Sequence, residues 1–270
     1  MNFLEKLDQA VKLNNSLLCL GLDIDLSRIP KFLLNKDDPI FTFNKAIIDE
    51  TRDLVCAYKP NIAFYEMYGI YGLESLIKTI EYLHGDVPVI LDAKRGDIGH
   101  TSAAYAKSLF EIYKADAATV SPYLGHDSIE PFLEYKDKGI FVLCLTSNPG
   151  SKDFQMLGDG EPLYKIVARK VKEWNTSSNL GLVVGATNPH ELKEIRTLVG
   201  DMPILIPGVG TQGGDLQYSV KNGVNKKGQR AIINAGRSII YASDREDFAR
   251  EAKLFARRMK DDINSFRYLG

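Results

Sequence analysis

The sequence is poor in several features that define whole classes of proteins. Only three of its 270 residues are cysteine, and Cys19, Cys56 and Cys144 form no CxxC pair. Each lies within an apolar run, so we expect buried free thiols in a reducing compartment rather than disulfides. No apolar run approaches the roughly 20 residues of a membrane span, and the amphipathic N-terminal stretch lacks the uninterrupted apolar core of a signal peptide. These absences predict a cytoplasmic protein that does not bind a membrane.

The chain also has almost no net charge, because 34 basic and 35 acidic residues give a formal value of -1 at pH 7. A chain of this kind has no global field to attract nucleic acid or an acidic membrane surface. An anionic ligand would therefore need a local cluster of positive charge. Apolar residues, at 44%, are numerous enough to form a large buried core.

Short apolar or β-branched runs alternate with longer segments of helical periodicity along the chain. A helix is expected at the N-terminus and after each run. Eight parallel strands, each followed by a helix, close most economically into a barrel, so we predict one (β/α)8 TIM barrel domain over residues 1–270. The expected strands are 17–23, 55–59, 88–94, 117–123, 139–147, 180–187, 203–210 and 230–237.

Two further features bear on this prediction. An open doubly wound sheet is the alternative fold, but no GxGxxG motif opens the first helix, as a dinucleotide-binding fold would prefer. The longest irregular stretch, residues 148–162, is a candidate lid.

The third predicted strand ends in LDAKRGDIGHT, which sets two acids and two bases at one strand end. Chemistry in such barrels gathers where strands end. Because alternate residues on a strand share a face, Asp92 and Lys94 should point into the barrel mouth and Arg95 away from it. An ammonium group among carboxylates stays protonated, so Lys94 would be a proton donor rather than a neutral nucleophile. The simpler alternative is an ordinary ion pair, with Asp97 or Thr101 capping the next helix.

Two glycine-rich stretches follow the last two predicted strands. One reads PGVGTQGGD from Pro207 and Gly208, and the other is NAGR, which ends in Gly236 and Arg237. Glycines let backbone N–H groups approach an oxyanion, and barrels often bind phosphate at this place. Arg237 would add a bidentate clamp, and Gln212 another donor. The glycines could instead serve only tight turns, but two such loops at these two strands favour a phosphate site.

These residues resemble a known family, the orotidine 5'-monophosphate decarboxylases. The resemblance rests on GLDID, YKPN, DAKRGDIGHTSAAYA, TSNPG, PGVGTQGGD and NAGR, which occur in the family's order between residues 21 and 237. The chain length and the long DAKRGDIGHTSAAYA form are similar to the bacterial branch with longer chains. The resemblance implies decarboxylation of orotidine 5'-monophosphate to UMP in de novo pyrimidine synthesis, without a metal or cofactor.

The resemblance also implies roles for single residues. Lys59, Asp92, Lys94 and Asp97 match the family's charged tetrad, in which the lysine at position 94 stabilises and protonates a carbanion at C6 of the pyrimidine. Asp97, with Ile98 and Thr101, would reach into the partner subunit's site across a homodimer. The other implied roles are ribose binding by Asp23 and Lys59, further substrate contacts by Asn61 and by Ser147, which faces the pyrimidine, and phosphate binding by Pro207, Gly208, Gln212, Gly236 and Arg237.

Two other functions are weighed against this one. A magnesium-dependent sugar-phosphate decarboxylase or aldolase of the same barrel group shares DxKxxD, but it carries a metal-binding glutamate where the second strand here ends in Lys59. A catalytically silent barrel that only binds nucleotides or a partner protein would not need Asp92, Lys94 and Asp97 together, because unbalanced acids that face an anion weaken its binding.

Overall fold

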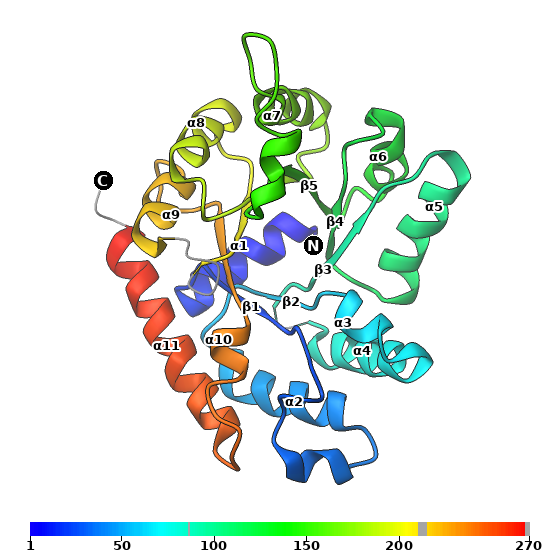
Figure 1. Ribbon diagram of the computed structural model, residues 1–270, viewed down its shortest axis with the longest axis vertical. Helices are drawn as coiled ribbons and strands as arrows, with labels where there is room; N and C mark the ends of the chain where they lie inside the picture. The colour runs from blue at the N-terminus through cyan, green and yellow to red at the C-terminus, as the bar shows by residue number, and fades with distance from the viewer. Residues whose placement is uncertain (86, 210–214, 268–270) are drawn as a thin grey trace.

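The computed structural model describes residues 1–85, 87–209 and 215–267 (Figure 1). Eight parallel strands form one sheet in the order β2-β1-β8-β7-β6-β5-β4-β3, with the helices around it. The predicted (β/α)8 barrel is confirmed. The strands are β1 (Leu18–Gly21), β2 (Ala57–Lys59), β3 (Ile90–Arg95), β4 (Ala117–Val120), β5 (Gly139–Leu145), β6 (Leu180–Val184), β7 (Ile204–Pro207) and β8 (Ala231–Ala235).

The barrel closes between β2 and β3 through short contacts rather than a long ladder. Tyr58 pairs with Val89, and Asn61 pairs with Asp92, as isolated parallel bridges. The backbone N–H of Asp92 donates to the carbonyl of Pro60 at 2.9 Å. This closure brings the end of β2 beside the end of β3, where the sequence places its charged residues.

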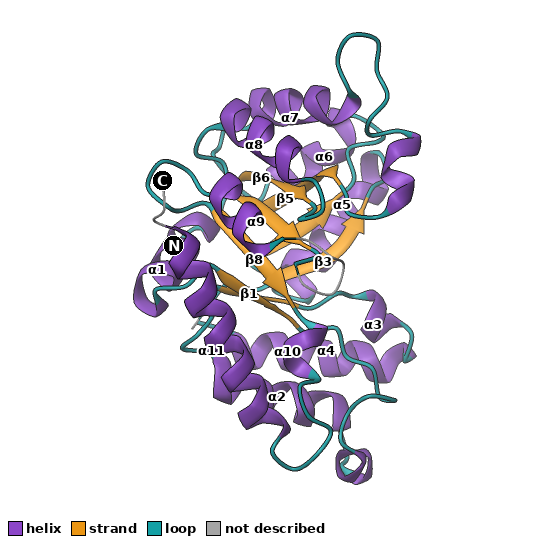
Figure 2. Ribbon diagram, turned by 60° about the vertical axis from the view of Figure 1, so that its left-hand side comes forward, coloured by secondary structure: helices purple, strands orange, loops and turns teal. Residues whose placement is uncertain are grey.

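Helices cover the outside of the barrel, as repeated βα units require (Figure 2). In the described ranges, no helix has the length and apolar character needed to cross a bilayer. The longer helices are α2 (Pro39–Thr51), α4 (Gly69–Leu83), α5 (Gly99–Lys107), α6 (His126–Leu133), α7 (Leu163–Trp174), α8 (Pro189–Val199), α9 (Leu216–Gly223) and α11 (Phe248–Arg267). Short helical turns are η1 (Lys31–Asn35), α3 (Ala63–Glu66), η2 (Ser108–Ile112), η3 (Pro149–Asp153) and α10 (Arg237–Ile240).

The N-terminal helix α1 (Phe3–Asn14) packs against the starts of the strands. The Phe3 ring meets the Phe141 ring edge-on, with centroids 5.6 Å apart. The Lys6 ammonium forms a 2.8 Å ion pair with Asp116, which precedes β4. This helix therefore covers the N-terminal end of the barrel, and the loops that can build a site lie at the other end.

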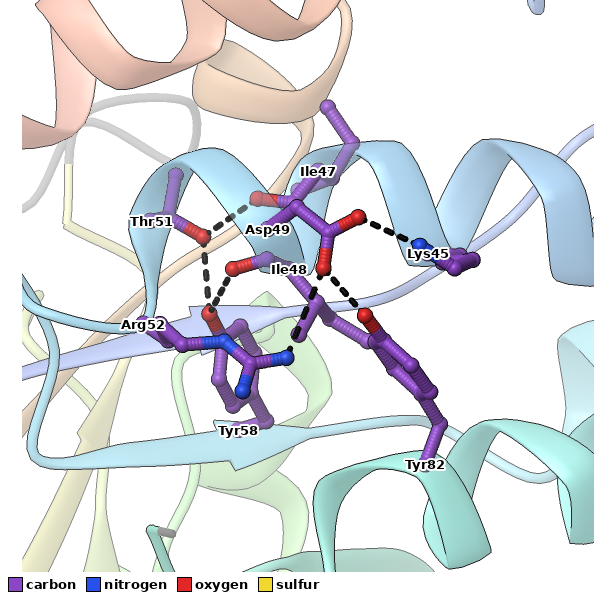
Figure 3. A network of polar contacts seen from close by, with 8 residues as sticks. All are labelled: Lys45, Ile47, Ile48, Asp49, Thr51, Arg52, Tyr58 and Tyr82. Atoms are coloured by element: carbon purple, nitrogen blue, oxygen red, sulfur yellow. Dashed lines mark hydrogen bonds and ion pairs between the residues drawn. The ribbon is translucent and has the colours of Figure 1, made fainter.

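Polar contacts tie α2 to β2 and α4 (Figure 3). On the buried side of the helix, the Thr51 hydroxyl lies 2.8 Å from the Tyr58 hydroxyl. On the exposed side, Asp49 accepts hydrogen bonds from Lys45, at 2.6 Å, and from the Tyr82 hydroxyl of α4. The buried tyrosine on β2 thus has a polar partner, which offsets the cost of removing its hydroxyl from water.

The core fills the barrel and the layer between strands and helices. Its members include all three cysteines, which are free and buried, as predicted. Burial raises the pKa of the Cys19 thiol to about 12. Because the thiolate is the reactive form, this residue is an inert part of the core.

The candidate lid, residues 148–162, was expected to be irregular throughout, but it begins with the 3-10 helix η3. The Gln155 side chain ties it to the end of β5: its carbonyl oxygen accepts from the Thr146 N–H at 2.7 Å, and its amide donates to the Thr146 hydroxyl at 3.0 Å. The loop between η3 and α7 projects outward (Figures 1 and 2). The first half of the stretch is therefore anchored beside the barrel mouth.

Candidate active site

A cavity of about 420 Å³ opens at the C-terminal ends of the strands. Its wall along β1 to β3 is charged, and its wall along β5 to β7 is largely apolar. Such a cavity suits a ligand with an apolar face and anionic groups. The charged residues at its lining are Asp23, Lys59, Asp92, Lys94 and Arg237, and the apolar ones include Leu143, Val183, Leu205 and Val209.

Most of the predicted site residues meet in this cavity. The residues that do are Asp23, Lys59, Asn61, Asp92, Lys94, Ser147, Pro207, Gly208, Gly236 and Arg237. Asp97, Ile98 and Thr101 are not part of its lining. Gln212 lies outside the described residues.

Asp92 holds two lysines at once. The Nζ atom of Lys59 lies 2.9 Å from Oδ2 of Asp92, and the Nζ atom of Lys94 lies 2.6 Å from Oδ1. The Lys59 side chain is 4% exposed, whereas that of Lys94 is 47% exposed. Lys94 is therefore the member of the array whose ammonium group is open to the cavity.

The two buried members of the array stay charged at neutral pH. Burial alone would raise the pKa of Asp92 and lower that of Lys59, because it penalises the charged form of each. Lys59 and Lys94 outweigh burial at Asp92 and hold its pKa well below the usual range. At Lys59, the negative charges of Asp92 and Asp23 outweigh burial and hold the pKa of the ammonium group above its usual range. The charges are thus in place before a ligand arrives.

Lys94 belongs to a bulge rather than to a regular strand. Leu91 of β3 lies opposite Ala118 of β4, but the next paired residues are Arg95 and Val120. Lys94 has a φ of +46°, in the left-handed region that costs a non-glycine residue of order 1 kcal/mol or more. Asp92 and Lys94 both line the cavity, as predicted, but the regular alternation assumed for them is wrong, because the extra residues of the bulge break the two-residue period. Strain of this kind persists only where the surrounding structure enforces it.

Arg95 faces away from the site, as predicted. Its guanidinium donates to the carboxylate of Glu66 at 2.7 Å and lies 5.1 Å from the ring centroid of Tyr105. It therefore contributes no charge to the lining of the cavity.

The suggestion that Asp97 or Thr101 caps the next helix is wrong. Helix α5 begins at Gly99, earlier than the predicted start at residue 102, and its N-cap is Ile98, which makes no side-chain cap hydrogen bond. Asp97 instead accepts from the N–H of Ile98 at 2.8 Å. Ile98 is 55% exposed, and Thr101 is also exposed. These side chains lie on the surface of the chain, outside its own cavity.

Two buried side-chain oxygens in the cavity wall have no hydrogen-bond partner among the described residues, namely Oδ1 of Asp23 and Oδ1 of Asn234. They come from the adjacent strand ends of β1 and β8. These ends approach closely because both carry glycine: a Cβ on Gly21 would lie 3.2 Å from the Cα of Gly236. Buried acceptors are normally satisfied, so a ligand with hydroxyl or N–H donors would fit here.

The remaining predicted residues lie around the other side of the cavity. Arg237, the first residue of α10, is exposed at the rim, and no described carboxylate forms an ion pair with it. Ser147 follows β5 and packs closely on Gly185, where an added Cβ would lie 2.7 Å from the Ser147 nitrogen. The arginine therefore provides positive charge at the end of β8, three strands around the barrel from the Lys94 strand β3.

Among the polar residues of the cavity to which sequence reasoning gave no role are Thr119 and Asn234. The Thr119 hydroxyl donates to Oδ1 of Asp92 at 2.9 Å. A signal for each was present, because Thr119 is the polar residue of an otherwise apolar strand and Asn234 begins the NAGR motif. Neither position could be given a role without the spatial partner that the fold supplies.

The fold and the site define a (β/α)8 barrel enzyme with an alternating array of ammonium and carboxylate groups at its strand ends. Residues 16–252 match the model of the orotidine 5'-phosphate decarboxylase / HUMPS family, and the chain belongs to this family.

Full-length relatives support the same placement. The chain is 52% identical over 270 residues to an orotidine 5'-phosphate decarboxylase of Ralstonia pickettii, with 99% of this chain and 100% of the relative covered. The structure of Leishmania donovani OMP decarboxylase matches with a TM-score of 0.86 and 38% identity, over 99% of this chain and 100% of that one. The structure of Leishmania donovani UMP synthase matches with a TM-score of 0.89 and 39% identity, but the chain, all of which is covered, spans only 57% of that larger protein.

Proposed function

We propose that Lys94 stabilises and then protonates the C6 carbanion in the decarboxylation of orotidine 5'-monophosphate to UMP, the reaction of pyrimidine biosynthesis that this enzyme catalyses. The observation that carries the proposal is the array Lys59, Asp92 and Lys94. Of its two lysines, Lys59 is buried and Lys94 opens into a cavity that Arg237 also lines. The array supplies a fixed positive charge, and the arginine suits a phosphate.

The chemistry of the step requires such a charge. When the bond between C6 and the carboxylate carbon breaks, CO₂ leaves and the electron pair stays on C6, where the pyrimidine ring cannot delocalise it well. A positioned ammonium group stabilises this pair and transfers a proton to it, which yields UMP and a neutral lysine. Lys94 then regains its proton from water.

Asp92 serves this step by fixing Lys94 in advance. Its Oδ1 atom holds the Lys94 ammonium at 2.6 Å, and its depressed pKa keeps it ionised. Asp92 would also face the substrate carboxylate, and like charges about 4 Å apart repel by roughly 4 kcal/mol at an effective dielectric near 20. The main contribution is preorganisation, because the charges need no rearrangement when the reaction occurs.

The ribose, the pyrimidine ring and the phosphate of the substrate bind to the remaining residues of the cavity. Asp23 and Lys59 bind the ribose hydroxyls, which supply the donors that the buried Asp23 oxygen lacks among the described residues. Ser147 contacts the pyrimidine, and Asn61 lines the same cavity. The phosphate is bound by Pro207, Gly208, Gln212, Gly236 and Arg237. Binding energy from this remote group would favour closure of the 148–162 stretch over the ring.

A second copy of the chain completes the site. Ile98 and Thr101 are exposed and Asp97 is half-buried, outside the chain's own cavity, where all three can enter a partner's cavity in a homodimer. Large apolar side chains that follow the neighbouring strand β4 are also exposed, with Tyr123 at 79% and Leu124 at 45%. Exposed apolar side chains of this size are typical of a subunit interface.

Mixing two inactive variants tests this sharing of residues. A heterodimer of Lys94→Ala and Asp97→Ala chains has one intact site and one doubly defective site. Random exchange of equal amounts should restore about a quarter of the wild-type activity, because half of the dimers are mixed. Lys94→Ala mixed with Lys94→Met is the control and should restore nothing, since both changes remove the same group from each chain's own cavity. The absence of recovery in the first mixture would show that Asp97 does not act across the interface.

The reaction itself is tested by the loss of orotidine 5'-monophosphate absorbance in the presence of excess chelator. We expect full activity, because the charge that stabilises C6 comes from Lys94. The magnesium-dependent alternative requires complete loss. Its metal-binding position is occupied here by Lys59, which is paired with Asp92. The buried free thiols support a cytoplasmic location.

A further inference from the structure

The bulge sets three residues of β3 opposite a single residue of β4. On β4, Ala118 and Val120 pair with β3 on either side of the bulge, and Thr119 lies between them. On β3, residues 92, 93 and 94 occupy the same interval. Two backbone N–H groups of the bulge, those of Ala93 and Lys94, therefore have no partner in the regular ladder. Both donate to the Thr119 hydroxyl oxygen instead, at 3.0 and 2.9 Å.

The same hydroxyl also contacts the charged array. It donates its proton to Oδ1 of Asp92 at 2.9 Å, the oxygen that binds Lys94 at 2.6 Å. A hydroxyl group has one donor and can accept two hydrogen bonds, so every bonding position of this one is used. Thr119 is 1% exposed, which leaves water no role in these contacts.

We propose that Thr119 is a positioning residue for the reaction. Its hydroxyl fixes both the left-handed backbone of Lys94 and the carboxylate of Asp92, and so determines the position of the Lys94 ammonium group. The inference rests on the role proposed for Lys94. It extends that role to a residue that needs no contact with the reacting atoms. A side chain without this hydroxyl would leave two backbone N–H groups of the bulge unpaired and would free the Asp92 carboxylate to turn.

The test compares Thr119→Val, which keeps the shape and removes the hydroxyl, with Thr119→Ser, which keeps the hydroxyl. For Thr119→Val we expect kcat to fall by roughly 10- to 100-fold, as for the loss of a hydrogen bond to a charged group, while the Kd for UMP changes by less than about threefold. Thr119→Ser should stay within about fivefold of the wild-type kcat. Thr119→Cys, with a thiol that is a weak acceptor, replaces the valine variant if that protein does not fold.

A matched control separates positioning from loss of stability. Thr79 of α4 is also buried; its hydroxyl donates to the Ser75 carbonyl at 2.7 Å and accepts from Asn44 at 3.2 Å, away from the cavity. Thr79→Val should lower the urea midpoint of unfolding and leave kcat unchanged.

Two results would overturn the proposal: a wild-type kcat in Thr119→Val, or a parallel loss of kcat and UMP affinity that the serine does not rescue. Failure of the role proposed for Lys94 would appear separately, as turnover by Lys94→Ala.

Discussion

The Lys94 ammonium lies 2.6 Å from the Asp92 carboxylate although the two residues do not belong to a regular stretch of strand. The bulge between them gives Lys94 a left-handed backbone, and a cost of this kind is retained where function requires the resulting geometry. Because Lys59 occupies the other oxygen of Asp92, the carboxylate has little freedom to move away from Lys94. The three charges therefore form one unit, and a change in any of them should affect both stability and catalysis.

Replacing Asp92 by asparagine should destabilise the protein strongly. The change leaves the buried Lys59 ammonium without its counter-charge, which typically costs about 3–5 kcal/mol. Urea unfolding at a fixed protein concentration measures this loss. Asp261→Asn on α11 is the matched control and should stay within about 0.5 kcal/mol of the wild type, because this carboxylate is exposed. Equal midpoints for the two variants would contradict the assignment of the buried pair.

The pH dependence of stability follows from the directions of the two pKa shifts. The depressed pKa of Asp92 means that its contribution is fully present above about 3.9 and is lost as the pH falls through the folded value. The raised pKa of Lys59 means that its contribution is present below about 10.4 and is lost as the pH rises through the folded value. Neither group should titrate between pH 5 and 9.

The absence of titration by Asp92 and Lys59 should also be visible in the pH dependence of kcat. At saturating substrate, we expect no acid-side ionisation with a pKa between 5 and 7, because Asp92 stays charged throughout that range. A rate profile measured in a series of buffers at constant ionic strength checks it. A loss of kcat that titrates near pH 6 would show that Asp92 is not held ionised in the way described.

Arg237→Ala should weaken binding of the phosphate rather than the chemical step. Loss of a charge-assisted contact is expected to raise the KM for orotidine 5'-monophosphate and the Kd for UMP by roughly 10- to 1000-fold. The affinity for uridine, which lacks the phosphate, should change by less than about threefold. Arg250→Ala on α11, where the side chain is 70% exposed, provides the control and should behave as the wild type. An unchanged preference for UMP over uridine would refute the phosphate-binding role.

The barrel and much of the cavity could be predicted from sequence because both follow from short-range patterns. Apolar runs that end in Asp23, Lys59 and Asp92 mark the strand ends, and parallel strands bring those ends together. The bulge at Lys94 could not be predicted, because a two-residue period assumes a regular partner strand. Thr119 remained unassigned for the same reason: its role exists only opposite the bulge.

Turnover by Lys94→Ala, followed by the ultraviolet absorbance of orotidine 5'-monophosphate beside a calorimetric titration with UMP, tests the central claim most directly. The proposed role predicts no measurable decarboxylation together with retained UMP binding, because the phosphate and ribose contacts do not involve this side chain. A variant that decarboxylates at a near wild-type rate would show that the C6 carbanion is stabilised by some group other than Lys94.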